Sequence, residues 1–319
     1  MNMAQKEKLV VIVGPTAVGK TELSLKLARA FDGEILSGDS MQVYRGMNVG
    51  TAKASPEELA MVPHHLIDIV EPDEEYSVAI FQTMARRLIS EINQRGHIPF
   101  IVGGTGLYIQ SVTHAYEFAD TAQDVELRER LQRYAELEGV DALHQRLAAI
   151  DPITAERLHP NDVKRVIRAI EIYEVTGSRM ADYQHREEQS GYEVMIIGLT
   201  MDRALLYERI NHRVDLMMEA GLVEEVRELL DRGFDPNSAA MQGLGYKELV
   251  PYLYGEITLE KAINDIKQRT RHFAKRQLSW FRRMPEIQWF DVTEPGSREA
   301  AFATISQTLA GKFSRTPNI

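Results

Sequence analysis

A glycine-rich loop near the N-terminus constrains the fold of this sequence more than any other segment. The loop matches the pattern G-x-x-x-x-G-K-[ST] without deviation and reads Gly14-Pro15-Thr16-Ala17-Val18-Gly19-Lys20-Thr21. A continuous apolar run at residues 9–13 precedes it, as expected of a strand buried on both faces, and a helical pattern at 20–31 follows it. Successive backbone N–H groups and the positive end of the helix then face one concavity. The sequence therefore predicts a strand–loop–helix unit that binds a diphosphate group.

The loop also offers its ligand a cation and a hydroxyl group. We expect Lys20 to neutralise the outer oxygens of the diphosphate, and Thr21 to ligate a Mg²⁺ ion that bridges the phosphates. The motif leaves the fate of the diphosphate open, because an ATPase, a kinase and an enzyme that expels diphosphate can all use it. Enzymes that hydrolyse NTP also carry an apolar strand ending in Asp, whereas the run at 98–102 leads into Gly103. This difference disfavours NTP hydrolysis.

Strand and helix patterns alternate around this loop. We expect strands at residues 34–37, 66–70, 98–102, 194–199 and, at an edge, 287–290. A helix is predicted at 77–95, and a short helix opens with a capping box from Ser55 to Glu58. Such alternation implies an α/β fold in which helices flank a parallel sheet, as in P-loop NTPases.

The pattern changes between residues 116 and 192, where helix signals replace strand signals. We expect helices at 124–138, 141–150 and 161–176, the last one capped by Asn161. The strand pattern returns near residue 194, and the last third of the chain is mostly helical. The predicted domains are a core made of residues 1–115 and 193–319 and an all-helical insertion made of residues 116–192.

Composition excludes several classes of protein. The sequence contains no cysteine, which excludes disulfides, zinc–thiolate sites and cysteine nucleophiles and fits a reducing cytosol. No apolar run reaches the length of a membrane span, and the polar residues 1–8 do not resemble a secretory signal. The net charge of -10 excludes a uniformly basic coat, although a local basic face remains possible. We expect a cytoplasmic protein that does not bind membranes.

Two further loops follow predicted strands at the edge where ligands of parallel sheets bind. Asp39 follows the strand at 34–37, where a carboxylate can accept a proton from a nucleophile or bind Mg²⁺ through water. The alternative is an Asp that merely caps the next turn. Thr105 lies in the glycine loop 103–106, which either brings it to a ligand or simply turns the chain into a helix.

Basic residues gather in three places of this acidic sequence. The segment 266–283 contains no acid, and its cations are Lys267, Arg269, Arg271, Lys275, Arg276, Arg282 and Arg283. Such a helix can follow a phosphate backbone, whereas a solvated face normally mixes charges of both signs. Helical spacing places its aromatic residues, including Phe273 and Trp280, in the core. Two smaller sets of cations are either functional or structural, and they comprise Lys164, Arg165 and Arg168, and Arg209 and Arg213. Arg209 and Arg213 either contact an anion or pair with Glu208 and Asp215.

Seven segments in this order resemble one family, the tRNA dimethylallyltransferases, also called tRNA isopentenyltransferases, in their bacterial form. The segments are residues 14–21, Asp39-Ser40-Met41-Gln42-Val43-Tyr44, Gly50-Thr51-Ala52-Lys53, residues 102–108, His159-Pro160-Asn161-Asp162, Gly243-Leu244-Gly245-Tyr246-Lys247, and Lys275-Arg276-Gln277-Leu278-Ser279-Trp280-Phe281-Arg282. The first is generic, while the second and the last are much more specific. The resemblance spans nearly the whole chain.

The resemblance implies a reaction. The dimethylallyl group of dimethylallyl diphosphate would move to N6 of the adenosine next to the 3′ side of a tRNA anticodon, and diphosphate would leave. Asp39 resembles the general base, and Thr16, Lys20 and Thr21, with Mg²⁺, would stabilise the charge on the departing diphosphate. Thr105 and Arg213 resemble further active-site contacts, and Arg209 would bind the diphosphate.

The resemblance also implies a tRNA-binding surface and a monomeric enzyme. The insertion would grip the anticodon stem–loop, and the target base would leave its stack to reach Asp39. The residues placed on the tRNA surface are Asp39, Ser40, Met41, Gln42, Thr105, Arg128, Lys164, Arg165, Arg168, Gln242, Lys247, Lys275, Arg276, Gln277 and Arg282.

Two other functions fit parts of the sequence. A kinase for nucleotides or small molecules would use ATP in the loop and Asp39 as the base for a hydroxyl group; the acid-free basic helix argues against it. A non-catalytic RNA-binding protein would keep a vestigial nucleotide site; the intact loop and Asp39 argue against that.

Overall fold

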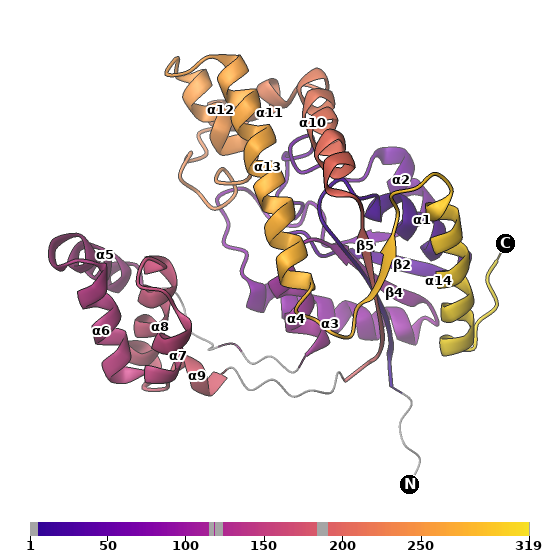
Figure 1. Ribbon diagram of the computed structural model, residues 1–319, viewed down its shortest axis with the longest axis horizontal. Helices are drawn as coiled ribbons and strands as arrows, with labels where there is room; N and C mark the ends of the chain where they lie inside the picture. The colour runs from indigo at the N-terminus through magenta and orange to yellow at the C-terminus, as the bar shows by residue number, and fades with distance from the viewer. Residues whose placement is uncertain (1–5, 115–117, 119–123, 184–190, 319) are drawn as a thin grey trace, which may run out of the picture. The chain divides into compact units, whose positions relative to one another are not determined.

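The computed structural model describes residues 6–114, 118, 124–183 and 191–318 (Figure 1). Its contacts divide the chain into two compact units. The core unit comprises Met1–Thr113 and Gly191–Ile319, and the insertion unit comprises His114–Ser190. Parts of the predicted domain boundary near residues 116 and 192 lie outside the described residues.

Within the described residues, the core unit contains a six-stranded sheet whose neighbouring strands all pair in parallel, so the predicted α/β class is confirmed. The strands are β1 Lys8–Val13, β2 Gly33–Ser37, β3 His64–His65, β4 Ile98–Gly103, β5 Glu193–Thr200 and β6 Gln288–Asp291, in the spatial order β3-β2-β4-β1-β5-β6. Residues 9–13 of β1 are fully buried, as their continuous apolar pattern predicts. The loops that follow β1, β2 and β4 therefore meet at one edge of the sheet.

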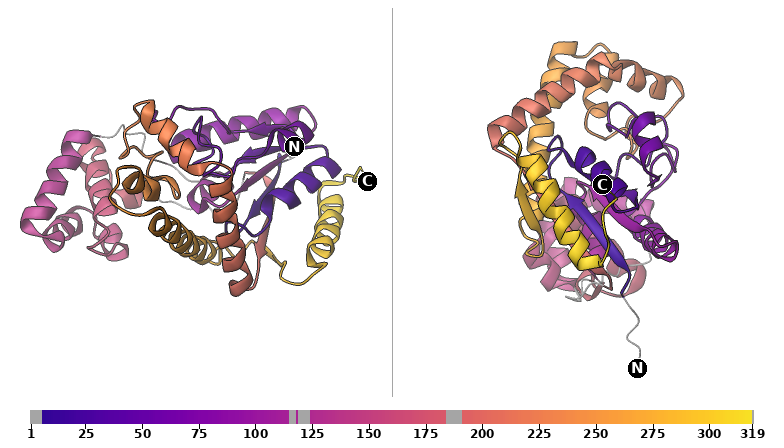
Figure 2. Two further views of the ribbon diagram at one scale, coloured as in Figure 1. Left: turned by 90° about the horizontal axis from the view of Figure 1, so that it is seen from above. Right: turned by 90° about the vertical axis from the view of Figure 1, so that its right-hand side faces the viewer.

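Helices cover both faces of this sheet. Those of the core unit are α1 Lys20–Ala30, α2 Pro56–Met61, α3 Val78–Gln94, α4 Gly106–Thr113, α10 Arg203–Glu219, α11 Leu222–Asp231, α12 Tyr246–Leu253, α13 Leu259–Phe281 and α14 Ser297–Phe313. Val10 and Ile12 of β1 pack toward α1 and α14, whereas Leu9 and Val11 pack toward α3 and α4, as side chains alternate along a strand. Figures 1 and 2 show α14 beside α1, and α10 to α13 gathered at one end of the sheet.

The prediction of a strand at residues 66–70 is wrong. β3 is limited to His64–His65, and residues 66–70 add only an isolated bridge between Tyr44 and Val70. Leu66 and Asp68 have positive φ angles of 62° and 53°, which interrupt an extended strand. The capping box of α2 is confirmed, because Ser55 accepts a hydrogen bond from the Glu58 amide and donates its own amide to the Glu58 carboxylate.

The insertion unit is helical throughout its described residues. It contains α5 Val125–Glu138, α6 Val140–Ile150, α7 Pro152–Arg157, α8 Val163–Thr176 and α9 Met180–Tyr183. Leu131, Leu143 and Val166 are fully buried and form its core. The prediction that Asn161 caps α8 is wrong: Asp162 precedes the helix and makes no side-chain cap, while the Asn161 amide donates to the His159 ring in the turn before it.

None of the helices in the described part of the chain is long and apolar enough to cross a lipid bilayer.

Candidate active site

Two adjoining cavities open where the strand-end loops of the core unit meet helices α10 and α13. The loop cavity has a volume of about 430 Å³, and its polar lining includes Thr16, Lys20, Thr21, Asp39, Arg209 and Arg213. The helix cavity has a volume of about 300 Å³, and its lining includes Ser40, Met41, Thr105, Lys247 and Arg276. The residues that line both cavities are Thr16, Asp39, Thr51, Ala52, Arg213 and Phe273. The two cavities therefore share a wall that contains Thr16, Asp39 and Arg213, whereas Thr105, the other predicted catalytic residue, lines only the helix cavity.

The loop cavity carries concentrated positive charge from Lys20, Arg209 and Arg213. Burial, reinforced by repulsion from Arg213, lowers the pKa of Lys20 to about 8, while Asp39 partly opposes the shift. Burial also lowers the pKa of Arg213, again against the attraction of Asp39. Neither Arg209 nor Arg213 makes a hydrogen bond or ion pair with any described residue. An anion with several charges would satisfy all three cations.

The alternative that Arg209 and Arg213 pair with nearby acids is not what the structure shows. Asp215 instead forms an ion pair of 2.6 Å with Lys267 of α13. Lys20 donates to the carbonyl oxygens of Gly14 and Pro15 at 3.0 and 2.9 Å, so its ammonium group lies against the loop itself.

Asp39 both turns the chain and faces the cavities. Its Oδ1 accepts a hydrogen bond of 2.8 Å from the Met41 amide, which is the turn-capping role that sequence reasoning left as an alternative. No hydrogen bond to its second carboxylate oxygen, Oδ2, involves a described residue. The amide of Ser40 donates to Thr105 Oγ1 at 3.2 Å, which ties the β2 loop to the β4 loop. The turn thus holds Asp39 in place and leaves one oxygen for a ligand.

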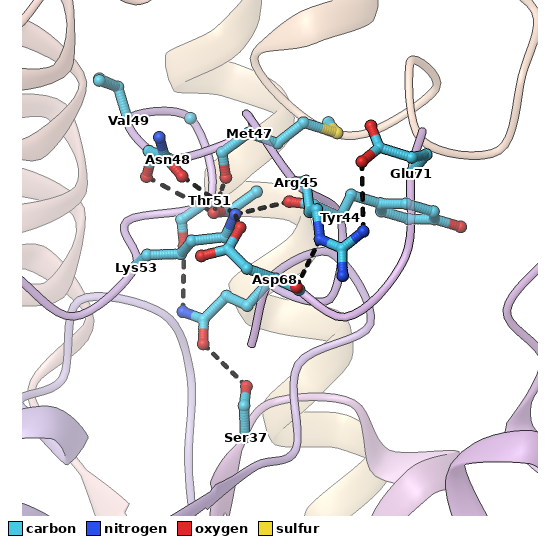
Figure 3. A network of polar contacts seen from close by, with 12 residues as sticks. Ser37, Tyr44, Arg45, Met47, Asn48, Val49, Thr51, Lys53, Asp68 and Glu71 are labelled. Carbon is cyan, nitrogen blue, oxygen red and sulfur yellow. Dashed lines mark hydrogen bonds and ion pairs between the residues drawn. The ribbon is translucent and has the colours of Figure 1, made fainter. Parts of the chain in front are cut away.

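The segment 50–53, which carries part of the family resemblance, is held by a buried lysine (Figure 3). Lys53 donates to the Tyr44 carbonyl at 2.5 Å, to Asn48 Oδ1 at 3.0 Å and to the Asp68 carboxylate at 2.5 Å. Its side chain is 5% exposed. Lys53 therefore fixes the loop that presents Thr51 and Ala52 to both cavities.

Gln42, which the family resemblance places on the tRNA surface, is half-buried and contacts the same loop. It accepts a hydrogen bond of 2.8 Å from Ser37 and donates to the carbonyls of Thr51 and Ala52 at 3.2 and 3.3 Å. Both ends of its amide are therefore occupied inside the protein.

Glu225 was missed by sequence reasoning and supports this loop from α11. Its carboxylate accepts the amides of Asn48, Val49 and Gly50 at 2.7 to 3.0 Å, and the hydroxyl of Tyr246 at 2.6 Å. Burial and the Glu225 charge both raise the pKa of Tyr246. No local pattern singles out Glu225, because its partners are far away in the sequence.

The basic helix α13 divides into a paired and an unpaired half. Lys267 pairs with Asp215, Arg269 with Glu248 at 3.5 Å, and Arg271 donates to Asn211 at 2.6 Å. In the second half, the exposed lysine and arginine residues are Lys275 and Arg276 and, just past the helix end, Arg282 and Arg283. No ion pair within the described ranges involves these four. The unpaired half is therefore the part that is available to an anionic partner.

The aromatic residues of α13 do not all enter the core. Phe281 is fully buried and Trp280 is partly buried, as predicted. Phe273 instead lines both cavities, and the Arg276 guanidinium lies 5.8 Å from its ring centre. Helical spacing alone does not distinguish a residue facing the core from one facing a cavity next to it.

Among the remaining predicted tRNA contacts of the core unit, Gln242 is exposed and Gln277 is buried. Gln242 donates to the Pro236 carbonyl at 3.0 Å. Only 6% of Gln277 is exposed, so the expectation that it lies on the tRNA surface is wrong.

The predicted tRNA residues of the insertion unit fall into two groups. Arg128 and Arg168 bind the fully buried carboxylate of Glu171 at 2.8 and 2.6 Å, so each has a structural partner. Burial alone would raise the pKa of Glu171, but the hydrogen bonds from these arginines outweigh burial and lower it. Lys164 and Arg165 are exposed, and Arg165 lies 3.4 Å from Asp162.

Comparison with known proteins gives one consistent result. A family model described as IPP transferase matches residues 42–284. The tRNA dimethylallyltransferase of Carboxydothermus hydrogenoformans is 59% identical over 309 residues, which cover 96% of this chain and 99% of that protein. The protein of the same name from Geobacillus thermodenitrificans is 50% identical over 314 residues, covering 98% of this chain and 99% of that protein.

Two solved structures are also similar. The tRNA isopentenylpyrophosphate transferase of Bacillus halodurans has a TM-score of 0.73 and 49% identity, with 97% of each chain covered. A eukaryotic dimethylallyltransferase described as acting on tRNA has a TM-score of 0.83 and 31% identity, covering 98% of this chain and 81% of that chain. The similarity therefore extends over nearly the whole chain and is not confined to the glycine loop.

Proposed function

The chain belongs to the IPP transferase family and transfers a dimethylallyl group to adenosine in tRNA, and we propose that its two cavities receive the donor and the acceptor. The shared wall carries this proposal, because Thr16, Asp39 and Arg213 line both cavities. A donor in the loop cavity and a nucleobase in the helix cavity would meet there. One chain supplies every residue of this wall, and we propose that the protein acts as a monomer in the cytoplasm.

The donor in this proposal is dimethylallyl diphosphate. Its diphosphate lies in the glycine loop, where the backbone amides, Lys20, Arg209 and Arg213 stabilise the negative charge that grows as the carbon–oxygen bond breaks. These cations are fixed before the reaction begins, so they need little reorganisation in the transition state. The diphosphate leaves with the bonding electron pair, and the carbon bonds to the adenine nitrogen.

The residues around the loop fit a Mg²⁺ ion that is held largely by the diphosphate. The Thr21 hydroxyl lines the loop cavity at the start of α1, and Asp39 faces the same cavity. Across the described ranges, no cluster of three or more His, Cys, Asp or Glu residues could hold a metal by itself. When bound, Mg²⁺ would neutralise diphosphate oxygens.

Asp39 is the proposed general base. Its free oxygen would accept a proton from the exocyclic N6 amine of adenine while the new carbon–nitrogen bond forms. An aromatic amine is a weak nucleophile, so holding the amine in line with the donor carbon matters more than basicity. The hydrogen bond from the Met41 amide gives Asp39 the fixed position that such alignment requires.

The tRNA surface in this proposal joins the unpaired end of α13 to the rim of the helix cavity. Arg276 belongs to both, and Ser40, Met41 and Lys247 line the same cavity. The insertion unit would bind the anticodon stem–loop through Lys164 and Arg165, which are exposed on α8. The acceptor adenosine, next to the 3′ side of the anticodon, would leave its stack to enter the helix cavity.

Mass spectrometry of tRNA incubated with the protein, Mg²⁺ and dimethylallyl diphosphate tests the function. We expect one adenosine to gain a dimethylallyl group in place of a hydrogen atom, with release of diphosphate. A transcript with guanosine at the proposed position serves as the control and should remain unmodified. Unmodified adenosine, or transfer of a phosphoryl group from ATP instead, would contradict the proposal.

Neutralising the free cations of α13 tests the tRNA surface. In the variant Lys275→Ala/Arg276→Ala, we expect the slope of log K for tRNA binding against log salt concentration to become shallower by about one to two, because fewer counterions are released. Titrations at several salt concentrations measure the slope. Lys312→Ala is the matched control, since Lys312 is exposed on α14. An unchanged slope in the double variant would show that these charges face only solvent.

A further inference from the structure

Helix α13 and the glycine loop after β4, which sequence analysis treated separately, pack closely against each other. Helix α13 places Gln277 and Trp280 against the glycine loop that follows β4. A Cβ atom on Gly104 would lie 2.0 Å from Gln277 Nε2, and one on Gly106 would lie 2.3 Å from the Trp280 ring. A Cβ atom on Gly104 would displace the Gln277 amide, and one on Gly106 would clash with the Trp280 ring. The close approach explains why this loop carries glycines there.

The amide of Gln277 uses this space to connect two loops of the active site. Its Oε1 accepts a hydrogen bond of 2.9 Å from the Thr16 amide, and its Nε2 donates one of 3.0 Å to the Gly104 carbonyl. Thr16 belongs to the glycine loop after β1, and Thr105, next to Gly104, accepts the amide of Ser40 from the β2 loop. One buried side chain thus completes a connection between all three strand-end loops.

The same helix also carries exposed charges next to Gln277. Lys275 and Arg276 precede Gln277 directly and are exposed, whereas Gln277 is buried. A rigid helix therefore joins the surface proposed for tRNA to the loop proposed for the donor. This arrangement gives the geometry of the shared wall a physical support outside the three loops.

We propose that Gln277 is a positioning residue for the transfer reaction, holding Thr16 and the 103–105 loop in register through its two hydrogen bonds. The inference rests on the proposed function. A glutamine is required because only an amide of this length both accepts from Thr16 and donates to Gly104. Displacing the Thr16 loop by about 1 Å would separate the donor carbon from the adenine amine, which costs about 10²-fold in rate.

The test compares Gln277→Met, which keeps the shape but loses both hydrogen bonds, with Gln277→Glu, which keeps only the acceptor. Gln268→Met is the matched control on the exposed face of α13. With both substrates saturating, we expect kcat to fall about 10²-fold in Gln277→Met and by less in Gln277→Glu. The Kd for tRNA should stay close to that of the unmodified protein in both variants.

A second variant, in the loop after β4, tests the same hydrogen bonds of Gln277. Gly104→Ala should push the Gln277 amide away and lower kcat without a comparable loss of tRNA affinity. An unchanged kcat in Gln277→Met would overturn the proposal, as would a loss confined to tRNA affinity, which would make Gln277 a direct tRNA contact. Melting temperatures show whether each variant is folded. If the unmodified protein itself leaves tRNA unchanged, the proposed function fails, and not the role of Gln277.

Discussion

Replacing Asp39 with asparagine is expected to lower the rate of dimethylallyl transfer by about 10²- to 10⁴-fold, the usual contribution of a general base. The amide oxygen of asparagine can still accept from the Met41 amide, so the turn should keep its shape. What would be lost is the carboxylate oxygen that we propose takes the proton from the adenine amine. The measurement is the single-turnover rate with saturating donor and tRNA.

The affinity for tRNA separates a chemical effect from a structural one. We expect the Kd of Asp39→Asn for tRNA to remain close to that of the unmodified protein. Asp73→Asn, at an exposed position between β3 and α3, is the matched control and should retain full activity. Turnover near the normal rate in Asp39→Asn would remove Asp39 as the base.

Replacing Lys20 with alanine is expected to weaken the binding of inorganic diphosphate with Mg²⁺ by about 10- to 100-fold, which is what one charge-assisted hydrogen bond contributes. Lys26→Ala is the matched control, because Lys26 lies on the same helix but pairs with Glu22 at the surface. Calorimetry with diphosphate and, separately, with ATP gives the affinities. Equal affinity of Lys20→Ala and the unmodified protein for diphosphate would contradict the assignment of the loop.

The pKa of Lys20 adds a dependence on pH to this prediction. The free protein has a Lys20 pKa of about 8, and a bound anion would raise it, since the ammonium form is the one that is stabilised. The contribution of Lys20 to diphosphate affinity should therefore have its full value below pH 8 and decrease as the pH rises above about 8. Lys20→Ala should lack this component, so the ratio of the two affinities shrinks at high pH.

Local sequence patterns were sufficient to predict much of the fold. The unbroken apolar run of β1 predicts burial on both faces, and the spacing of Ser55 and Glu58 predicts a capping box; both are confirmed. The parallel sheet follows from the alternation of strands and helices, and it is confirmed as well. These features depend on residues that are neighbours in the sequence, which is why the sequence reveals them.

Features that depend on contacts between residues far apart in the sequence could not be predicted from local patterns. Gln277 lies 261 positions from Thr16, and Arg128 lies 43 positions from Glu171, so the family resemblance placed on the tRNA surface two side chains that have long-range partners inside the protein. Leu66 and Asp68 likewise have positive φ angles although neither is a glycine, so their residue types do not predict this backbone conformation. The catalytic and tRNA-binding roles assigned to individual residues remain predictions.

The late position of α13 in the chain has a consequence for biosynthesis. The glycine loop leaves the ribosome early, yet Phe273 and Gln277, which line its cavity, are translated only in the last part of the chain. A nascent polypeptide that stops before residue 259 would carry the phosphate-binding motif with that side of its cavity missing. Under the proposed function, the cavity for the donor would therefore be complete only near the end of synthesis, together with the helix proposed to contact tRNA.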